Sequence, residues 1–192
     1  MDPCLFYTRD LSLIIVIYVD DGIVICKNVV QMENLLQELG KEFQITHGAL
    51  NRYLGMEIKT LDDGSIFLNQ GSYAQKLIRK FGFEDLQPSS SPADKNVDLD
   101  VVLDSRELKG EIFREAVGSL MYLSTMTRPD IAFAVSKVSQ YTSKPHQIHW
   151  NAVKRIFSYL KGTANYGILY SSGGEDLEGF SDADYARDKE GR

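Results

Sequence analysis

Residues 11–26, LSLIIVIYVDDGIVIC, form an apolar run that is interrupted mainly by Ser12 and by the acidic pair Asp20-Asp21. The segments on either side of the pair are rich in β-branched residues and too short for helices, which predicts two strands buried on both faces. Asp21-Gly22 is a typical hairpin signal, because a tight primed turn needs residues that tolerate positive φ. The sequence therefore predicts an antiparallel hairpin that turns at Asp21-Gly22.

The acidic pair at the tip of this hairpin is open to two interpretations. In the first, Asp20 and Asp21 simply end the hairpin and face water. In the second, the two adjacent carboxylates share a cation, because like charges next to apolar strands are otherwise costly to ionise. Magnesium is the ion that best suits paired hard oxygen ligands.

Length and composition indicate a globular chain. With 192 residues, of which 43% are hydrophobic, the sequence can form a core in one large or two small domains. Its longest apolar run, about nine residues, is far shorter than the roughly 20 that a membrane helix needs, and no signal-peptide pattern is present. Cys4 and Cys26 have no metal-binding spacing, so we expect reduced, buried thiols. These features predict an intracellular protein without a membrane partner.

The charge of the chain is unevenly distributed. Its net charge of −6 argues against a general nucleic-acid binder. Residues 106–161, however, contain nine basic and four acidic residues, a local charge of +5, whereas the remainder carries −11. On a predicted helix in this segment, Lys154, Arg155 and Lys161 are candidates for contacts with phosphates. Solvated helix faces would produce the same charge pattern.

A helix and a second hairpin follow the acidic hairpin. Asn28 is a typical N-cap, and the apolar residues of 32–43 recur at helical spacing. Residues 53–58 and 64–68 resemble strands joined by the turn signal Asp62-Asp63-Gly64. Gly55 inside the first of these strands favours close approach of another backbone, although an edge hairpin without a ligand explains the pattern equally well.

The second half of the chain is predicted to be largely helical. Ser72 to Gln75 fits a capping box, and Gly82 ends the helix that follows. Residues 84–105 lose periodicity and form a Pro- and Ser-rich linker, which we expect to be the flexible point of the chain. Three further helices precede Pro129, follow it, and run from Pro145 to Gly162.

Two smaller features complete the sequence. His146 and His149 are spaced like a metal pair, but the absence of further ligands nearby favours ordinary helix-end histidines. Residues 166–170 and 177–182 resemble two strands around a Gly173-Gly174 turn.

A series of motifs resembles one known family in the right order along the whole chain. Tyr18-Val19-Asp20-Asp21 resembles the palm metal motif of reverse transcriptases. The later segments resemble the signature of copia-type (Pseudoviridae) retrotransposon Pol polyproteins: REAVGSLMYL at 114–123, TRPDI at 127–131, HW at 149–150, KR at 154–155, YLKGT at 159–163 and GFSDAD at 179–184. The last of these resembles the opening of the family's ribonuclease H domain.

This resemblance implies an α+β fold. Residues 1–70 would be the C-terminal half of a reverse transcriptase palm, with antiparallel hairpins plus a helix. Residues 71–164 would form a helical thumb and connection that contains the linker 84–105. Residues 165–192 would be the truncated first strands of a ribonuclease H-like domain.

The resemblance also implies roles for individual residues. Asp20 and Asp21 would be catalytic metal ligands, and Asp182 the first ligand of an incomplete ribonuclease H site. The sequence departs from the family after Asp182, with Tyr185 where Trp is usual and Arg187 where Gly is usual. A primer-grip-like segment would be formed by Tyr53, Leu54, Gly55 and Met56.

The implied activity is RNA-directed DNA polymerisation by two-metal phosphoryl transfer, with Mg²⁺ or Mn²⁺ as cofactor. The implied partners are an RNA or DNA primer–template, deoxynucleoside triphosphates and the remainder of the Pol polyprotein. We expect a cytoplasmic retrotransposon particle as the location, with a nuclear phase left open. In the family, the third palm carboxylate lies upstream, so we expect this fragment to be inactive alone. The alternative is a decayed or repurposed fragment that binds nucleic acid or protein without catalysis.

Overall fold

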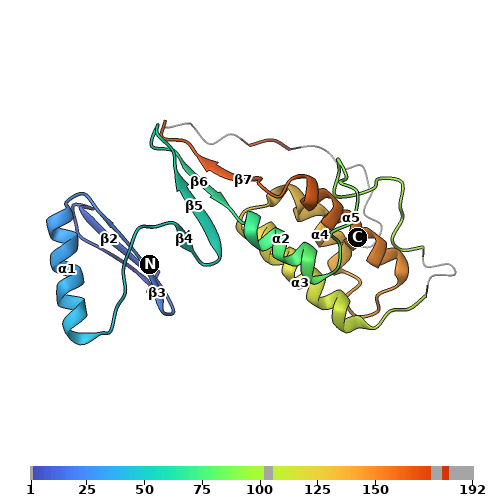
Figure 1. Ribbon diagram of the computed structural model, residues 1–192, viewed down its shortest axis with the longest axis horizontal. Helices are drawn as coiled ribbons and strands as arrows, with labels where there is room; N and C mark the ends of the chain where they lie inside the picture. The colour runs from blue at the N-terminus through green and yellow to red at the C-terminus, as the bar shows by residue number, and fades with distance from the viewer. Residues whose placement is uncertain (1, 102–105, 174–178, 182–192) are drawn as a thin grey trace.

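The computed structural model describes residues 2–101, 106–173 and 179–181. A three-stranded sheet and one helix lie at one end, a four-stranded sheet lies in the middle, and four α-helices lie at the other end (Figure 1). All strand pairs are antiparallel. The α+β class predicted from the sequence is confirmed. None of the described helices is both long enough and apolar enough to cross a membrane.

The first sheet contains the apolar run. Its strands, in spatial order, are β1 (Leu5–Tyr7), β2 (Leu13–Tyr18) and β3 (Asp21–Cys26), followed by helix α1 (Val29–Glu42). Asn28 caps α1 as predicted, because its side chain accepts a 2.9 Å hydrogen bond from the Val30 N–H. The prediction that the strands are buried on both faces is wrong: no residue of β1, β2, β3 or α1 is buried. One helix beside three strands is too little protein to enclose both faces of the sheet.

The second sheet joins distant segments. Its order is β4 (Arg52–Tyr53), β5 (Met56–Thr60), β6 (Ile66–Asn69) and β7 (Gly167–Tyr170). Strand β7, which the sequence placed at the start of a ribonuclease H domain, pairs with β6, with Phe67 opposite Leu169. A domain boundary at residue 165 would therefore separate strands that share one sheet.

The hydrophobic core lies among the helices. These are α2 (Gly71–Lys80), α3 (Gly110–Met126), the short 3₁₀ helix η1 (Pro129–Ile131), α4 (Ala132–Ser139) and α5 (Gln147–Gly162). Most residues of the apolar stripes that the helical periodicity predicts are buried: Phe113, Val117, Leu120, Ile131, Ala134, Val135, Val138, Val153, Phe157 and Leu160. The stripe residue Met121, however, is 49% exposed, and Ser124 and Trp150 are only partly buried. As predicted, Pro129 follows the end of α3 and begins η1, and Gly162 is the last residue of α5.

The linker after α2 is attached to the helices. The Ser89 N–H donates a 3.2 Å hydrogen bond to the Ser158 carbonyl on α5. His149, which is 1% exposed, lies 3.0 Å through Nε2 from the Leu99 carbonyl and accepts a 2.9 Å bond at Nδ1 from the His146 N–H. Both imidazole nitrogens of His149 thus bond to backbone groups, which is the role predicted for a helix-end histidine. The linker, expected to be flexible, is anchored at both of these points.

Candidate metal and nucleic-acid site

The acidic pair lies at the tip of the β2–β3 hairpin, but the turn is not at Asp21-Gly22. Tyr18 pairs with Asp21 and Ile17 with Gly22, so Val19 and Asp20 form the two-residue turn. A turn at Asp21-Gly22 would place residues 13–16 opposite Lys27 and the start of α1. The observed register instead pairs these apolar residues with residues 23–26, and the apolar cross-strand pairs outweigh the preference of Asp-Gly for a turn.

The backbone at the tip is strained. Val19 has a φ of +56°, a conformation that β-branched residues rarely adopt, and its side chain is 85% exposed. Such a conformation costs on the order of 1–3 kcal/mol, and strain of this kind is concentrated at functional sites. Asp20 and Asp21 are both exposed, and their side chains make no hydrogen bond or ion pair with any described residue. Their carboxylates are therefore available to a ligand from solution.

The described residues do not complete a metal site around this pair. No group of three or more His, Cys, Asp or Glu side chains that could hold a metal ion exists in the described part of the chain. Asp182 lies outside the described residues. Two hard oxygen ligands nevertheless match the way Mg²⁺ is often held, by one or two carboxylates together with waters and substrate phosphates.

The primer-grip-like segment forms a second tight turn. Tyr53 pairs with Met56, and the two turn residues, Leu54 and Gly55, have φ values of +46° and +75°. Two positive φ values are typical of a type I′ turn, which explains why glycine occupies one of the positions. The prediction that Gly55 lies inside a strand is therefore wrong. The Tyr122 hydroxyl on α3 donates a hydrogen bond to the Leu54 carbonyl.

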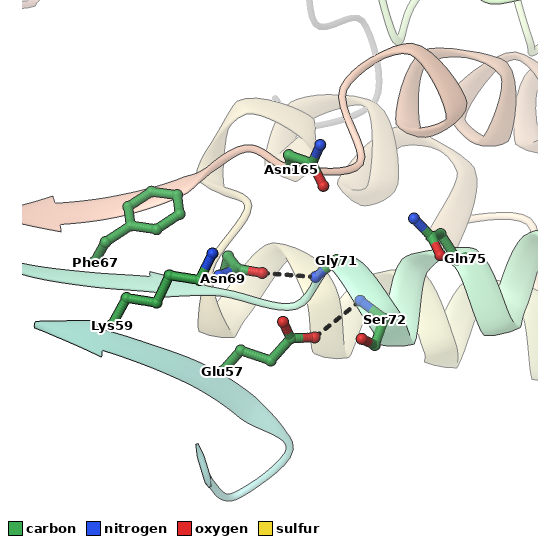
Figure 2. Close-up of a pocket in the computed structure, with 8 residues that line it drawn as sticks. All are labelled: Glu57, Lys59, Phe67, Asn69, Gly71, Ser72, Gln75 and Asn165. Atoms are coloured by element: carbon green, nitrogen blue, oxygen red, sulfur yellow. Dashed lines mark hydrogen bonds between the residues drawn. The ribbon is translucent and has the colours of Figure 1, made fainter. Parts of the chain in front are cut away.

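The N-terminus of α2 lies next to this hairpin and is capped from a distance. The Ser72 N–H donates a 3.0 Å bond to Glu57 Oε1 on β5, and the Gly71 N–H donates a 3.0 Å bond to Asn69 Oδ1 (Figure 2). The hydrogen bonds from Ser72 lower the pKa of Glu57. The predicted capping box from Ser72 to Gln75 is wrong, because α2 begins at Gly71. Sequence reasoning missed Glu57, since nothing local links it to a helix fourteen residues later.

A polar cavity of about 150 Å³ lies beside these caps. Figure 2 shows its lining: Glu57, Lys59, Phe67, Asn69, Gly71, Ser72, Gln75 and Asn165. The cavity lies between β5, β6, α2 and the segment that precedes β7.

The three basic candidates on α5 have different surroundings. Lys161 Nζ donates hydrogen bonds to the carbonyls of Glu84 and Leu86, the latter at 2.9 Å. Arg155 forms a 3.3 Å ion pair with Asp94 of the linker. The Lys154 side chain has no hydrogen bond or ion pair with a described residue, and Lys154 is half-buried. Phosphate binding by these residues stays a prediction, and two of them also hold the linker.

The sequence matches a family model described as reverse transcriptase (RNA-dependent DNA polymerase) over residues 4–95, which contain both tight turns. It is 33% identical over its whole length to the Retrovirus-related Pol polyprotein from transposon TNT 1-94 of Nicotiana tabacum. It is 34% identical over 94% of its length to that from transposon RE2 of Arabidopsis thaliana. Residues 4–95 thus belong to the reverse transcriptase family, and the whole chain is similar to transposon Pol polyproteins. The resemblance deduced from the order of motifs is confirmed.

The chain spans a small part of these relatives, 15% of the tobacco Pol polyprotein and 12% of the RE2 one. It covers 71% of an uncharacterized mitochondrial protein of Arabidopsis thaliana, to which it is 31% identical over 90% of its own length. No solved structure matches the chain.

Proposed function

We propose that this chain is the part of an RNA-directed DNA polymerase of an LTR retrotransposon that carries the catalytic acidic hairpin and the primer-grip turn. The observation that carries the proposal is the exposed Asp20-Asp21 pair beside the strained Val19, within the segment that matches the reverse transcriptase family. Synthesis would follow two-metal phosphoryl transfer in the full-length protein.

Mg²⁺, with Mn²⁺ as a substitute, is the cofactor we propose for this pair. Asp20 and Asp21 would hold it through exposed oxygens, and phosphates and an upstream carboxylate would supply further ligands. When bound, the ion would neutralise phosphate charge and activate the primer hydroxyl. The chain's own contribution is to present two unpaired carboxylates on a hairpin whose register is fixed by the apolar pairs of β2 and β3.

Nucleic acid and deoxynucleoside triphosphates are the proposed ligands. The Leu54-Gly55 turn offers backbone groups that a primer end can approach closely, because Gly55 has no side chain. The helical segment 106–161 carries a charge of +5, which favours a phosphate backbone over base-specific contacts. The remainder of the Pol polyprotein is the proposed protein partner, and a retrotransposon particle in the cytoplasm, with a nuclear phase left open, is the proposed location.

The test places this segment in a longer Pol chain that supplies the upstream palm and fingers. Asp20→Asn should abolish magnesium-dependent primer extension and leave the circular dichroism spectrum unchanged, because the turn and the strand pairs remain. Asp62→Asn, in the exposed turn between β5 and β6, is the matched control and should retain activity. Full activity of Asp20→Asn would refute the metal assignment. The 192-residue chain alone should extend no primer, because two metals require carboxylates from separate strands.

A non-catalytic role is the second candidate. It is supported by the mitochondrial relative, most of whose length this chain covers. A longer Pol chain that stays inactive with intact Asp20 and Asp21, together with salt-dependent binding of nucleic acid by this chain, would favour this role.

A further inference from the structure

We propose that Tyr122 is a positioning residue for the primer end, because its hydroxyl fixes the Leu54-Gly55 turn to helix α3. The inference rests on the proposed primer-grip function of that turn. It adds that the helical unit, formed by α2 to α5, helps to determine where the turn lies, and that the hairpin alone does not.

The hydrogen bond between Tyr122 and Leu54 joins residues 68 positions apart in the chain. The accepting carbonyl belongs to a turn residue, outside the paired positions of β4 and β5, which end at Tyr53 and Met56. No hydrogen bond of the strand ladder therefore holds this carbonyl. The Tyr122 hydroxyl holds the carbonyl instead, from helix α3, which follows the linker 84–105 in the sequence.

Gly55 fits the same hydroxyl. A Cβ atom at position 55 would lie 2.5 Å from the Tyr122 hydroxyl oxygen but 3.6 Å from the ring carbon that carries it. The hydroxyl alone, and not the ring, therefore excludes a side chain at this position. The φ of +75° is a separate reason for glycine, since alanine adopts it only with strain.

Tyr122 is itself held in place by neighbouring helices. Its ring meets that of Tyr73 on α2 edge to face, with centroids 5.3 Å apart and planes at 89°. Burial raises the pKa of the Tyr122 hydroxyl, Tyr73 adds to the rise, and the Gln70 side chain opposes it. Gln70, 2% exposed at the start of α2, accepts a 2.9 Å bond from Thr127 at the end of α3. The ring that carries the hydroxyl is thus packed against α2, and the start of α2 is itself bonded to the end of α3.

The experiment measures where a bound primer end lies and how tightly the duplex binds. The 192-residue chain is incubated with a primer–template whose primer 3′ end carries a photo-cross-linker, and the cross-linked residues are identified by mass spectrometry. The dissociation constant is measured in parallel by fluorescence anisotropy. Tyr122→Phe removes only the hydroxyl, and Tyr73→Phe removes the hydroxyl of the partner ring as the matched control. Thermal unfolding checks that each variant is folded.

We expect the wild-type primer end to cross-link within residues 53–56. Tyr122→Phe should lower this yield about three- to tenfold, the worth of one buried hydrogen bond, with the dissociation constant and the Tyr73→Phe yield unchanged. Gly55→Ala should also lower the yield. Adding Tyr122→Phe to Gly55→Ala should recover part of the loss, because the group that the new methyl meets has gone.

The outcomes separate the two proposals. If the wild-type primer does not bind, or cross-links elsewhere, the primer-grip function fails and the inference fails with it. If the wild type cross-links at the turn and Tyr122→Phe does so equally well, the primer grip stands and the role of Tyr122 is refuted. A Tyr122→Phe variant that loses affinity and cross-linking in equal proportion would also refute positioning.

Discussion

Arg128 is a buried cation whose removal should strongly destabilise the helical unit. It is 1% exposed, and its guanidinium donates bonds of 2.9 and 2.8 Å to the two carboxylate oxygens of Asp130. It also donates to the carbonyl and the hydroxyl of Thr163, at 2.9 and 2.6 Å. The guanidinium lies 5.7 and 5.6 Å from the ring centroids of Tyr159 and Tyr166. Arg128 therefore joins the corner before η1 to the end of α5.

Arg128→Met should remove all of these bonds while keeping most of the volume. Breaking a buried ion pair typically costs 3–5 kcal/mol. The Asp130 side chain is 32% exposed, so water can partly replace the guanidinium, and we expect a loss of about 3 kcal/mol, at the lower end of that range. Arg128→Lys keeps the charge but not the planar fork and should cost about 1–2 kcal/mol. Urea unfolding followed by circular dichroism measures both changes in the free energy of unfolding.

The pH dependence provides a second measurement of the same network. Burial would raise the pKa of Asp130, but the hydrogen bonds from Arg128 and Tyr159 lower it below the ordinary value of 3.8. A carboxylate with a lowered pKa stabilises the fold above its ordinary pKa, and this contribution is lost as the pH falls through the folded-state value. The difference between wild type and Arg128→Met should therefore narrow on going from pH 7 toward pH 3.

The control is Arg79→Met, at an exposed position of α2, which should change the free energy of unfolding by less than about 0.5 kcal/mol. If Arg128→Met is no less stable than that control, or the gap does not depend on pH, the network does not stabilise the fold as argued.

Two further predictions concern other parts of the fold. In Gly167→Ala, the new Cβ would lie 2.1 Å from the Leu68 carbonyl oxygen, so β7 should separate from β6. The free energy of unfolding should fall by about 1–3 kcal/mol in the urea assay. Gly173→Ala, with open space around the new Cβ, is the control and should leave the free energy of unfolding unchanged. Burial lowers the pKa of His149, with His146 adding to this and Leu99 and Asp100 opposing it, so the free energy of unfolding should fall as the pH drops below about 6.5. A His149→Gln variant with the same slope between pH 7.5 and 5.5 would contradict this assignment.

The helices could be predicted from the sequence because their signals are local. The apolar stripes, Pro129 and Gly162 each act over a few residues, and residues of those stripes form much of the core. The two tight turns could not be placed, because register depends on how many apolar pairs form along whole strands. Asp-Gly favours a turn, but the pairing of residues 13–16 with residues 23–26 stabilises the observed register more.

Contacts between segments far apart in the chain could not be predicted from the sequence either. Glu57 caps α2, Tyr122 holds Leu54, and Lys161 binds the linker; the two partners lie 15, 68 and 75 positions apart in the sequence. Family resemblance suggested roles for the acidic pair and for residues 53–56, which composition and spacing left ambiguous, and these roles stay proposals. It did not indicate Tyr122, whose role depends on an aromatic contact with Tyr73 and a turn carbonyl in another unit.

The position of the core is relevant to the proposal that this segment is active only within a larger protein. The buried apolar cluster begins at Ala74 and lies in the helical unit, whereas the sheet that carries Asp20 and Asp21 has no buried residue. Instead it exposes large apolar side chains: Leu5, Phe6, Tyr7, Ile17, Tyr18, Val19 and Ile25. Apolar surface of this extent favours association with other protein, and the tobacco relative is a Pol polyprotein of which this chain spans 15%. Under the proposed function, the protein that covers these side chains would also supply the further carboxylate of the metal site. Stability of the sheet and completion of the metal site would then depend on one docking event.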